Sequence, residues 1–159
     1  MDIDEKYMIL ALEEAYKSKE RNEVPVGAIV VINSEVIAKA HNQSIFQNDP
    51  TSHAEINALR NAAKKVGNYR LTGATLYTTL EPCAMCYGAI THARISRFVF
   101  GAYDSKTGVC GSSFNLHEQA CFNHTPLMTG GVLKEDCSLI LKDFFKERRN
   151  QTVYIPPFT

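Results

Sequence analysis

Apolar residues at helical spacing mark both ends of the chain. Between residues 4 and 20, Met8, Ala11, Leu12 and Ala15 recur at i, i+3, i+4 and i+7 with charged residues between them, which predicts an amphipathic helix. The same periodicity returns near the other end and predicts a final helix that reaches about residue 149, carried by Leu133, Cys137, Ile140, Leu141, Phe144 and Phe145.

Short β-branched runs lie between these helices. Residues 24–32 and 36–40 flank Asn33-Ser34 and predict a β-hairpin, and Gly27 in the first run suggests that a ligand or another backbone comes close there. Residues 75–79 and 97–100 predict two further strands. Strands that alternate with helices at this spacing predict a single α/β domain over residues 1–159, with helices on both faces of the sheet.

Two further helices follow from local start signals. The polar segment 41–52 contains Asp49-Pro50 and predicts a loop that ends in Thr51 or Ser52 as a helix cap, so that His53 opens a helix to about residue 65. Pro82 is typical of the start of a helix and predicts one over about 83–91, while residues 104–111 predict a loop.

Composition bounds the class of protein. With 45% hydrophobic and 21% charged residues, and no apolar run near the roughly 18 residues of a membrane span, the chain reads as a globular protein without membrane association. The acidic first five residues lack a signal sequence, and five cysteines form an odd set. Both observations favour the cytoplasm, a reducing compartment.

Net charge does not identify a partner. The 17 basic and 17 acidic residues cancel, so there is no global electrostatic argument for a nucleic acid and none against one. The final helix carries a local excess of cations, namely Lys142, Lys146, Arg148 and Arg149 against Asp143 and Glu147. That excess fits either an RNA contact or a solvated helix face.

The most specific chemistry lies in His53-Ala54-Glu55 and Pro82-Cys83-Ala84-Met85-Cys86. One imidazole and two thiolates suit Zn²⁺, and three ligands leave a fourth position for a water whose pKa the metal lowers to about 7. Glu55 is then free to move protons between that water and a leaving amine. A structural zinc site would need a fourth protein ligand at short spacing, and the chain has no second Cys-x-x-Cys or closely spaced His pair. A redox pair would not require the upstream His-x-Glu.

Longer motifs extend the pattern, and with them the chain resembles the bacterial tRNA-specific adenosine deaminases, which convert the wobble adenosine of an arginine tRNA anticodon to inosine. The zinc motif alone indicates only the wider cytidine-deaminase-like superfamily. The flanking segments that narrow the likeness are Val24-Pro25-Val26-Gly27-Ala28, His41-Asn42, Asp49-Pro50-Thr51-Ser52, Asn68-Tyr69-Arg70-Leu71, Thr79-Leu80-Glu81, Phe100-Gly101-Ala102-Tyr103-Asp104-Ser105-Lys106-Thr107-Gly108, Phe122-Asn123-His124 and Phe144-Phe145.

The resemblance implies a three-layer α/β/α fold with a mixed five-stranded sheet, and a homodimer whose active sites lie near the subunit interface. It assigns one zinc ion per chain to His53, Cys83 and Cys86, and proton transfer to Glu55. Asn42 would hold the flipped nucleoside near its sugar, with the backbone at Ala28 close to the base. The candidates to contact the tRNA anticodon stem-loop are Arg70, Arg94, Asp104, Lys106, Asn123, His124, Phe145 and Arg148.

Alternatives stay open beside these roles. Asp104 also fits a turn cap, Arg70 and Arg94 fit surface ion pairs, and Phe145 fits a core position. Tyr87, Thr125 and the apolar tail 153–159 depart from the family pattern. For the whole protein, the rivals are a zinc deaminase of a free nucleobase or nucleoside such as guanine, cytosine or cytidine, and a non-catalytic zinc-stabilised binding module.

Overall fold

The computed structural model describes residues 1–119 and 121–151, so the tail 153–159 lies outside the described residues. A mixed five-stranded sheet runs through the fold, in the order β2-β1-β3-β4-β5. β1 (Gly27–Ile32) pairs antiparallel with β2 (Glu35–His41) and with β3 (Thr75–Leu80), whereas β3, β4 (Arg97–Ala102) and β5 (Leu127–Gly130) run parallel. The five-stranded mixed sheet is confirmed.

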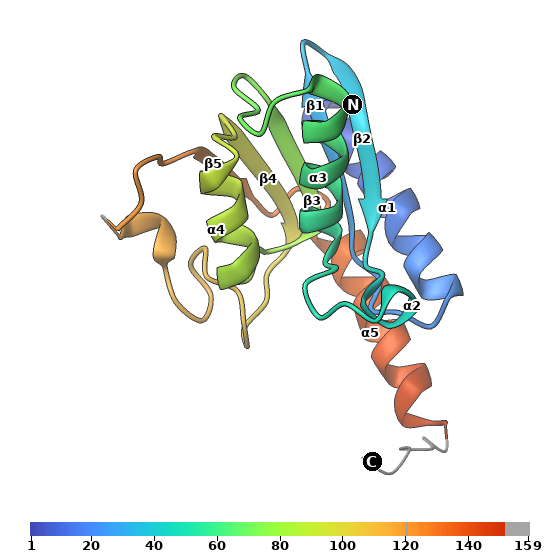
Figure 1. The fold of residues 1–159 in the computed structure, drawn as a ribbon. Helices are drawn as coiled ribbons and strands as arrows, with labels where there is room; N and C mark the ends of the chain where they lie inside the picture. Colours follow the sequence, from blue (N-terminus) through green and yellow to red (C-terminus); the bar gives the residue numbers. More distant parts are fainter. Residues whose placement is uncertain (120, 152–159) are drawn as a thin grey trace.

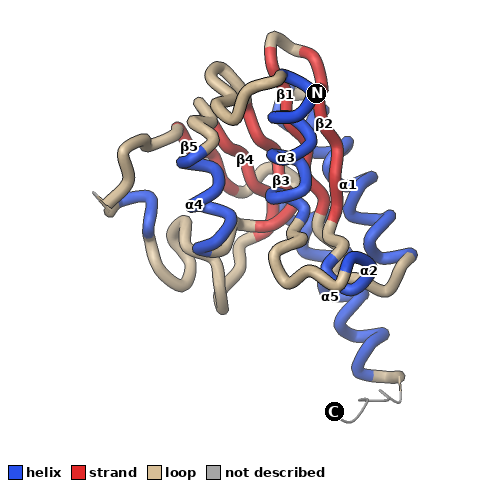
Figure 2. Tube along the Cα trace, in the orientation of Figure 1, coloured by secondary structure: helices blue, strands red, loops and turns tan. Residues whose placement is uncertain are grey.

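Helices cover both faces of this sheet (Figures 1 and 2). α1 (Ile3–Glu20) and α5 (Lys134–Arg149) pack on one face around a core that includes Met8, Ile29, Val99 and Ile140. α3 (Ala54–Val66) and α4 (Ala84–His92) pack on the other face, where the core includes Ala58, Leu76, Ile90 and Phe98. The predicted three-layer α/β/α arrangement is therefore correct, and no helix of residues 1–119 and 121–151 is long and apolar enough to cross a bilayer.

The hairpin is confirmed in detail. Asn33 and Ser34 have φ of 49° and 62°, the left-handed pair that a two-residue turn between twisted strands requires. Gly27 lies against the α1 backbone at Ala11, where a Cβ would collide with the Ala11 carbonyl oxygen. The close approach predicted for Gly27 is thus to another backbone.

Two local predictions were wrong, and one strand was missed. The predicted loop 41–52 contains the short helix α2 (Ser44–Gln47), and neither Thr51 nor Ser52 caps α3, whose N-cap is His53. Hydrophobic periodicity also missed β5, an edge strand of four residues in which Leu127 is 71% exposed. Such a strand has too few buried positions to produce an alternating pattern.

The sheet topology brings strand ends and helix starts together at one end of the molecule. β3 and β4 are parallel, so their carboxyl ends meet at the same edge of the sheet, where α/β proteins commonly bind ligands. α3 and α4 both begin at this edge (Figure 1). We call it the site end, and the opposite edge, where α3 and α4 terminate, the far end.

Candidate metal centre

Two helix starts bring the three predicted ligands together. His53 is the N-cap of α3, with extended φ and ψ of −75° and 155°, and Cys83 is the N-cap of α4, with −78° and 175°. Cys86 lies one turn into α4. His53 Nδ1 lies 3.7 Å from Cys83 Sγ and 3.5 Å from Cys86 Sγ, and the three ligand atoms all lie within 4.8 Å of one another.

These separations fit zinc. Tetrahedral zinc with sulfur at about 2.3 Å and nitrogen at about 2.0 Å holds the two ligand atoms about 3.6 Å apart. Of the residues that the structure describes, no other group of three His, Cys, Asp or Glu side chains comes together in this way. The zinc-binding character of the site therefore rests on donor type and on distance.

The cysteine pair also favours a cation. The Cys86 thiol and the His53 ring lower the pKa of Cys83 to about 4, and the same contact between the sulfurs, with burial, raises the pKa of Cys86. Without a metal the pair thus holds one negative charge readily and resists a second. A divalent cation between the two sulfurs removes that conflict and binds both as thiolates.

Glu55 lies beside the ligands in the first turn of α3 and is only 4% exposed. Burial raises the pKa of its carboxyl group, which suits a residue that must both accept and release a proton near neutral pH. Thr78 Oγ1, from β3, donates a hydrogen bond of 2.9 Å to Glu55 Oε1. One carboxylate oxygen is thereby fixed, which orients the other.

Asn42 is half-buried at the end of β2, and its side chain supplies the contact that the predicted cap does not. Asn42 Oδ1 accepts a hydrogen bond of 2.7 Å from the backbone N–H of Ala54, which fixes the amide and leaves its NH₂ group as the free donor. Ala28 is fully buried and pairs with Thr78 in the sheet. No part of Ala28 is exposed, and its predicted approach to the base stays a prediction.

The loop after β4 carries two more predicted residues. Asp104 is half-buried, and its carboxylate accepts hydrogen bonds from the N–H groups of Lys106 and Thr107 and from the Thr107 hydroxyl. This is the turn-capping role that the sequence left open. The Lys106 side chain is exposed at the tip of the turn.

The end of α5 carries the next pair. Phe145 is 42% exposed and is not a core residue, unlike Phe144 beside it. The Arg148 guanidinium lies 5.0 Å from the centre of the Phe144 ring and donates a 3.4 Å hydrogen bond to the Asn22 carbonyl. Asn22 follows α1, whose last turn reaches the site end through the Ser18 hydroxyl bonded to the Asn42 carbonyl.

The remaining candidates lie away from the zinc ligands. Arg94 follows α4 at its far end, and the chain at Leu71, next to Arg70, donates a 2.7 Å backbone hydrogen bond to Ala93 there. His124 Nε2 donates to the carbonyl of Ile95, two residues before β4 begins. The structure therefore does not bring Arg70, Arg94, His124 or its neighbour Asn123 together with the zinc ligands of the same chain.

Tyr87, a departure from the family pattern, is an internal anchor. It is 1% exposed, its ring packs edge-on against Phe98 and Phe122, and its hydroxyl lies 3.1 Å from His117 Nδ1. Tyr87 therefore ties the segment around η1 (Leu116–Glu118) to α4. Thr125, the second departure, is exposed.

Sequence reasoning missed three residues that hold the site. Thr78 orients Glu55. Asn57 donates to the His41 carbonyl and to the Ser52 hydroxyl, which fixes the segment that leads to His53. Glu81 accepts hydrogen bonds from backbone N–H groups of the loop after β4 and so fixes that loop. The available signal for Asn57 was a polar residue among apolar neighbours, and for Glu81 a single carboxylate between a predicted strand and a predicted helix. For Thr78 there was none, because threonine is an ordinary strand residue.

Comparison with known proteins agrees with this geometry. Residues 1–102 match the family of the cytidine and deoxycytidylate deaminase zinc-binding region. The tRNA-specific adenosine deaminase of Haemophilus influenzae is 53% identical over 94% of this chain and 87% of its own length, and that of Bacillus subtilis is 46% identical over 95% and 94%.

Solved structures give the same result. One from a study of A-to-I editing by tRNA deaminases at the wobble position of transfer RNA superposes with a TM-score of 0.84 at 43% identity, covering 86% of this chain and 99% of that one. A guanine deaminase from Nitrosomonas europaea has a TM-score of 0.75 at 21% identity, covers 91% of this chain and 85% of that one, and shows the fold alone. The chain belongs to the tRNA-specific adenosine deaminases, within the zinc-binding cytidine and deoxycytidylate deaminase family.

Proposed function

We propose that this protein hydrolyses adenosine to inosine at the wobble position of a tRNA anticodon loop, with an arginine tRNA as substrate and one zinc ion per chain. The observation that carries the proposal is a buried carboxylate, Glu55, beside three ligands at zinc distances. Because tRNA works in the cytoplasm, we place the enzyme there.

The residues divide the chemistry between them. His53, Cys83 and Cys86 would hold a zinc ion, whose chemistry would be to lower the pKa of water so that it can act as a nucleophile at neutral pH. Glu55 would take the two protons of the attacking water in turn and deliver one to N1 of adenine and one to the amino group, which leaves as ammonia. Thr78 holds Oε1 of Glu55 throughout, so Oε2 is the oxygen that exchanges protons.

Substrate binding uses the site end. The free NH₂ of Asn42 offers a donor next to His53 and Glu55, where the resemblance places the sugar of the flipped nucleoside. Lys106 and Arg148 supply positive charge for phosphates, and the exposed ring of Phe145 offers a stacking surface. A loop base suits this arrangement because its extrusion costs a few kcal/mol or less.

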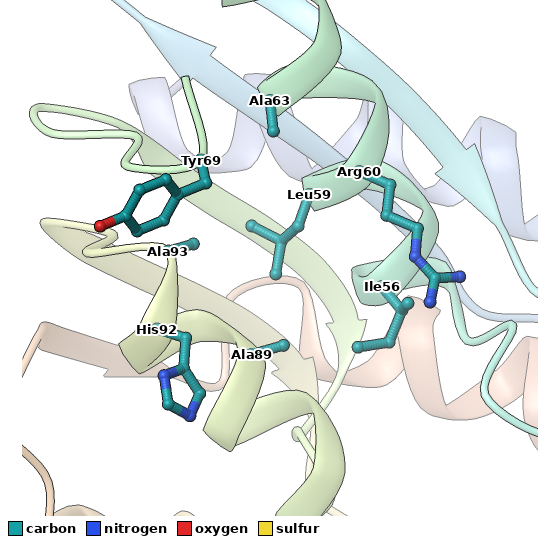
Figure 3. A pocket seen from close by; sticks show the side chains of 8 residues that line it. All are labelled: Ile56, Leu59, Arg60, Ala63, Tyr69, Ala89, His92 and Ala93. Atoms are coloured by element: carbon teal, nitrogen blue, oxygen red, sulfur yellow. The ribbon is translucent and has the colours of Figure 1, made fainter. Parts of the chain in front are cut away.

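A homodimer would use the outer surface of α3 and α4. A groove of about 290 Å³ lies between these helices and is lined mainly by apolar side chains (Figure 3): Ile56, Leu59, Arg60, Ala63, Tyr69, Ala89, His92 and Ala93. In a dimer across this groove with its two-fold axis perpendicular to α3 and α4, these helices run in opposite directions in the two copies. The far end of one copy, with Arg70 and Arg94, would then lie near the site end of the other.

Mixing two inactive variants tests that arrangement. If Arg94 serves the site of the partner subunit, Glu55→Ala and Arg94→Ala proteins that exchange subunits form one intact site per mixed dimer. Random exchange should then restore about a quarter of wild-type activity from two parents that are each inactive or weak. Activity that stays at the average of the two parents would place Arg94 in its own chain's site or outside it.

The activity itself is tested with three substrates. Purified zinc-loaded protein should convert adenosine to inosine in an arginine tRNA anticodon hairpin, read by sequencing, and leave free guanine and free cytidine unchanged. Turnover of a free base without hairpin turnover would favour the nucleobase deaminase. No ammonia release from any of the three would favour a non-catalytic zinc module.

A second measurement tests the RNA contacts. Lys106→Ala and Arg148→Ala should each weaken hairpin binding and make the plot of log affinity against log salt shallower by about 0.7 to 0.9 per lost phosphate contact. Lys6, an exposed cation in the first turn of α1, on the face of the sheet opposite α3 and α4, gives a matched control. Wild-type affinity and salt slope in both test variants would remove the physical support for RNA binding at this surface.

A further inference from the structure

Glu81 is a buried carboxylate whose partners all come from one loop. It is 2% exposed, and no Lys, Arg or His side chain of residues 1–119 and 121–151 forms an ion pair with it. Its oxygens instead accept hydrogen bonds from the N–H groups of Asp104 at 3.1 Å, Cys110 at 2.9 Å and Ser112 at 3.2 Å, and from the Ser112 hydroxyl.

The backbone around Glu81 holds the same loop. The N–H of Glu81 donates to the Ala102 carbonyl at 2.8 Å, and the Pro82 carbonyl accepts from Val109 at 3.0 Å. Gly108 packs directly on the Glu81 carboxyl group, where a Cβ would collide with its carbon. The loop 104–112 is thus attached, on both sides of its turn, to the segment that continues into Cys83.

The attachment to Glu81 fixes the backbone of the loop at Lys106. Asp104, bonded to Glu81 through its N–H, caps the turn and fixes the backbone of Lys106. Lys106 is exposed at the tip. A charged acceptor that is desolvated and bonded to four donors sets one loop conformation, because each donor loses its partner if the loop shifts.

We propose that Glu81 is a positioning residue for the substrate: it locks the loop 104–112 to the Pro82-Cys83 segment so that Lys106 reaches a phosphate of the RNA whose base occupies the zinc site. This inference rests on the proposed function. Glu81 touches neither substrate nor metal in this role, and it acts on RNA affinity through Lys106.

A double-mutant cycle tests the inference with the zinc-loaded protein and an anticodon hairpin. Glu81→Gln keeps the shape of the side chain but turns an NH₂ group toward loop N–H donors, and it should raise the hairpin Kd by about tenfold. It should also flatten the salt slope as Lys106→Ala does. Glu118→Gln removes an exposed carboxylate from the same stretch of chain and should change neither quantity.

The deciding quantity is the energetic coupling between the Glu81 and Lys106 substitutions. If Glu81 acts through Lys106, Lys106→Ala should change the Kd less than about twofold in the Glu81→Gln background, while it weakens binding clearly in the wild type. Additive effects would overturn the inference, because a general loss of stability leaves the Lys106 contact intact. A silent Lys106→Ala in the wild type would also overturn it, whereas loss of hairpin deamination by the wild type itself would overturn the proposed function.

Ser112 provides a milder change that keeps the test valid if Glu81→Gln does not fold. Ser112→Ala deletes only the hydroxyl donor and should weaken binding in the same non-additive way with Lys106→Ala. Ser112→Thr keeps the donor and should bind the hairpin more tightly than Ser112→Ala. Equal affinities for the two Ser112 variants would overturn the inference.

Discussion

Thr78→Val removes one proton donor from Glu55, the proposed catalytic carboxylate, and little else. Valine has nearly the shape of threonine and suits a strand, and position 78 is completely buried in β3 between β1 and β4. The Thr78 hydroxyl has a single proton and two acceptors in reach, Glu55 Oε1 at 2.9 Å and the Leu80 carbonyl at 3.3 Å. The proton points to Glu55, the nearer acceptor, so the substitution removes the hydrogen bond to Glu55.

The size of the effect follows from the charge of the acceptor. A buried hydrogen bond to a charged group contributes about 1.5–3 kcal/mol, and each 1.4 kcal/mol is about tenfold in rate. If orientation of Glu55 is needed only while protons move, the loss appears in kcat. We therefore expect kcat to fall by between about tenfold and about 150-fold, with hairpin KM changed less than about threefold.

The assay is single-turnover and steady-state deamination of an anticodon hairpin, with zinc measured in each preparation. Thr79→Val is a matched control, because Thr79 is equally buried but its hydroxyl accepts from the Gly27 N–H at 3.1 Å and does not contact Glu55. It should lower stability and leave kcat near wild type. Equal kcat losses in the two variants, or an unchanged kcat in Thr78→Val, would refute the orienting role of Thr78.

Three further outcomes are expected. Glu55→Ala should abolish deamination and retain about one zinc per chain by metal analysis, since Glu55 is not a ligand; loss of the metal would make it one. Cys83→Ser or Cys86→Ser should lower both zinc content and melting temperature, and an unchanged melting temperature in both would mean that folding does not depend on the metal. Asp4→Asn should cost about 2 kcal/mol of unfolding free energy at pH 7, because Asp4 binds Arg97 at 2.6 and 2.9 Å. Arg97 lowers the pKa of Asp4 in the folded state, so this stabilisation is complete above the unfolded pKa of about 4 and should vanish in denaturant melts as pH falls through the lower folded value.

The zinc ligands and Glu55 could be predicted from the sequence because their chemistry is encoded locally. His53 and Glu55 lie two positions apart, Cys83 and Cys86 lie one helical turn apart, and both pairs follow recognisable helix-start signals. What the spacing could not supply was the contact between the two helices. That contact depends on the sheet, in which β2 and β3 both run antiparallel to the intervening β1, so that the carboxyl end of β2, which leads to α3, and that of β3, which leads to α4, lie at one end.

Residues that act through distant partners left no local pattern. Glu81 reads as one polar residue between a strand and a helix, and its four donors lie 23 to 31 positions further along the chain. Asn42 was assigned to the nucleoside by resemblance, yet half of its amide caps α3 through Ala54, 12 positions away. Hydrogen bonds of this range are determined by tertiary packing, which propensities and periodicity do not describe.

The proposed RNA contacts lie at two ends of the molecule, and a dimer explains this separation. The resemblance makes Arg70, Arg94 and Lys106 candidates for one RNA surface, but it does not record which copy of the chain provides each residue. Lys106 lies on the loop that is bonded to the Glu81-Pro82 segment next to Cys83, whereas Arg70 and Arg94 lie where α3 and α4 end, next to the groove that contains Tyr69. An anticodon loop is large enough to contact both copies of a small dimer. If the proposed dimer forms across the groove, a monomeric variant with an intact zinc site should retain Glu55 chemistry on bound RNA and lose the affinity that Arg70 and Arg94 provide. Groove substitutions that separate the subunits should then raise KM far more than they lower kcat.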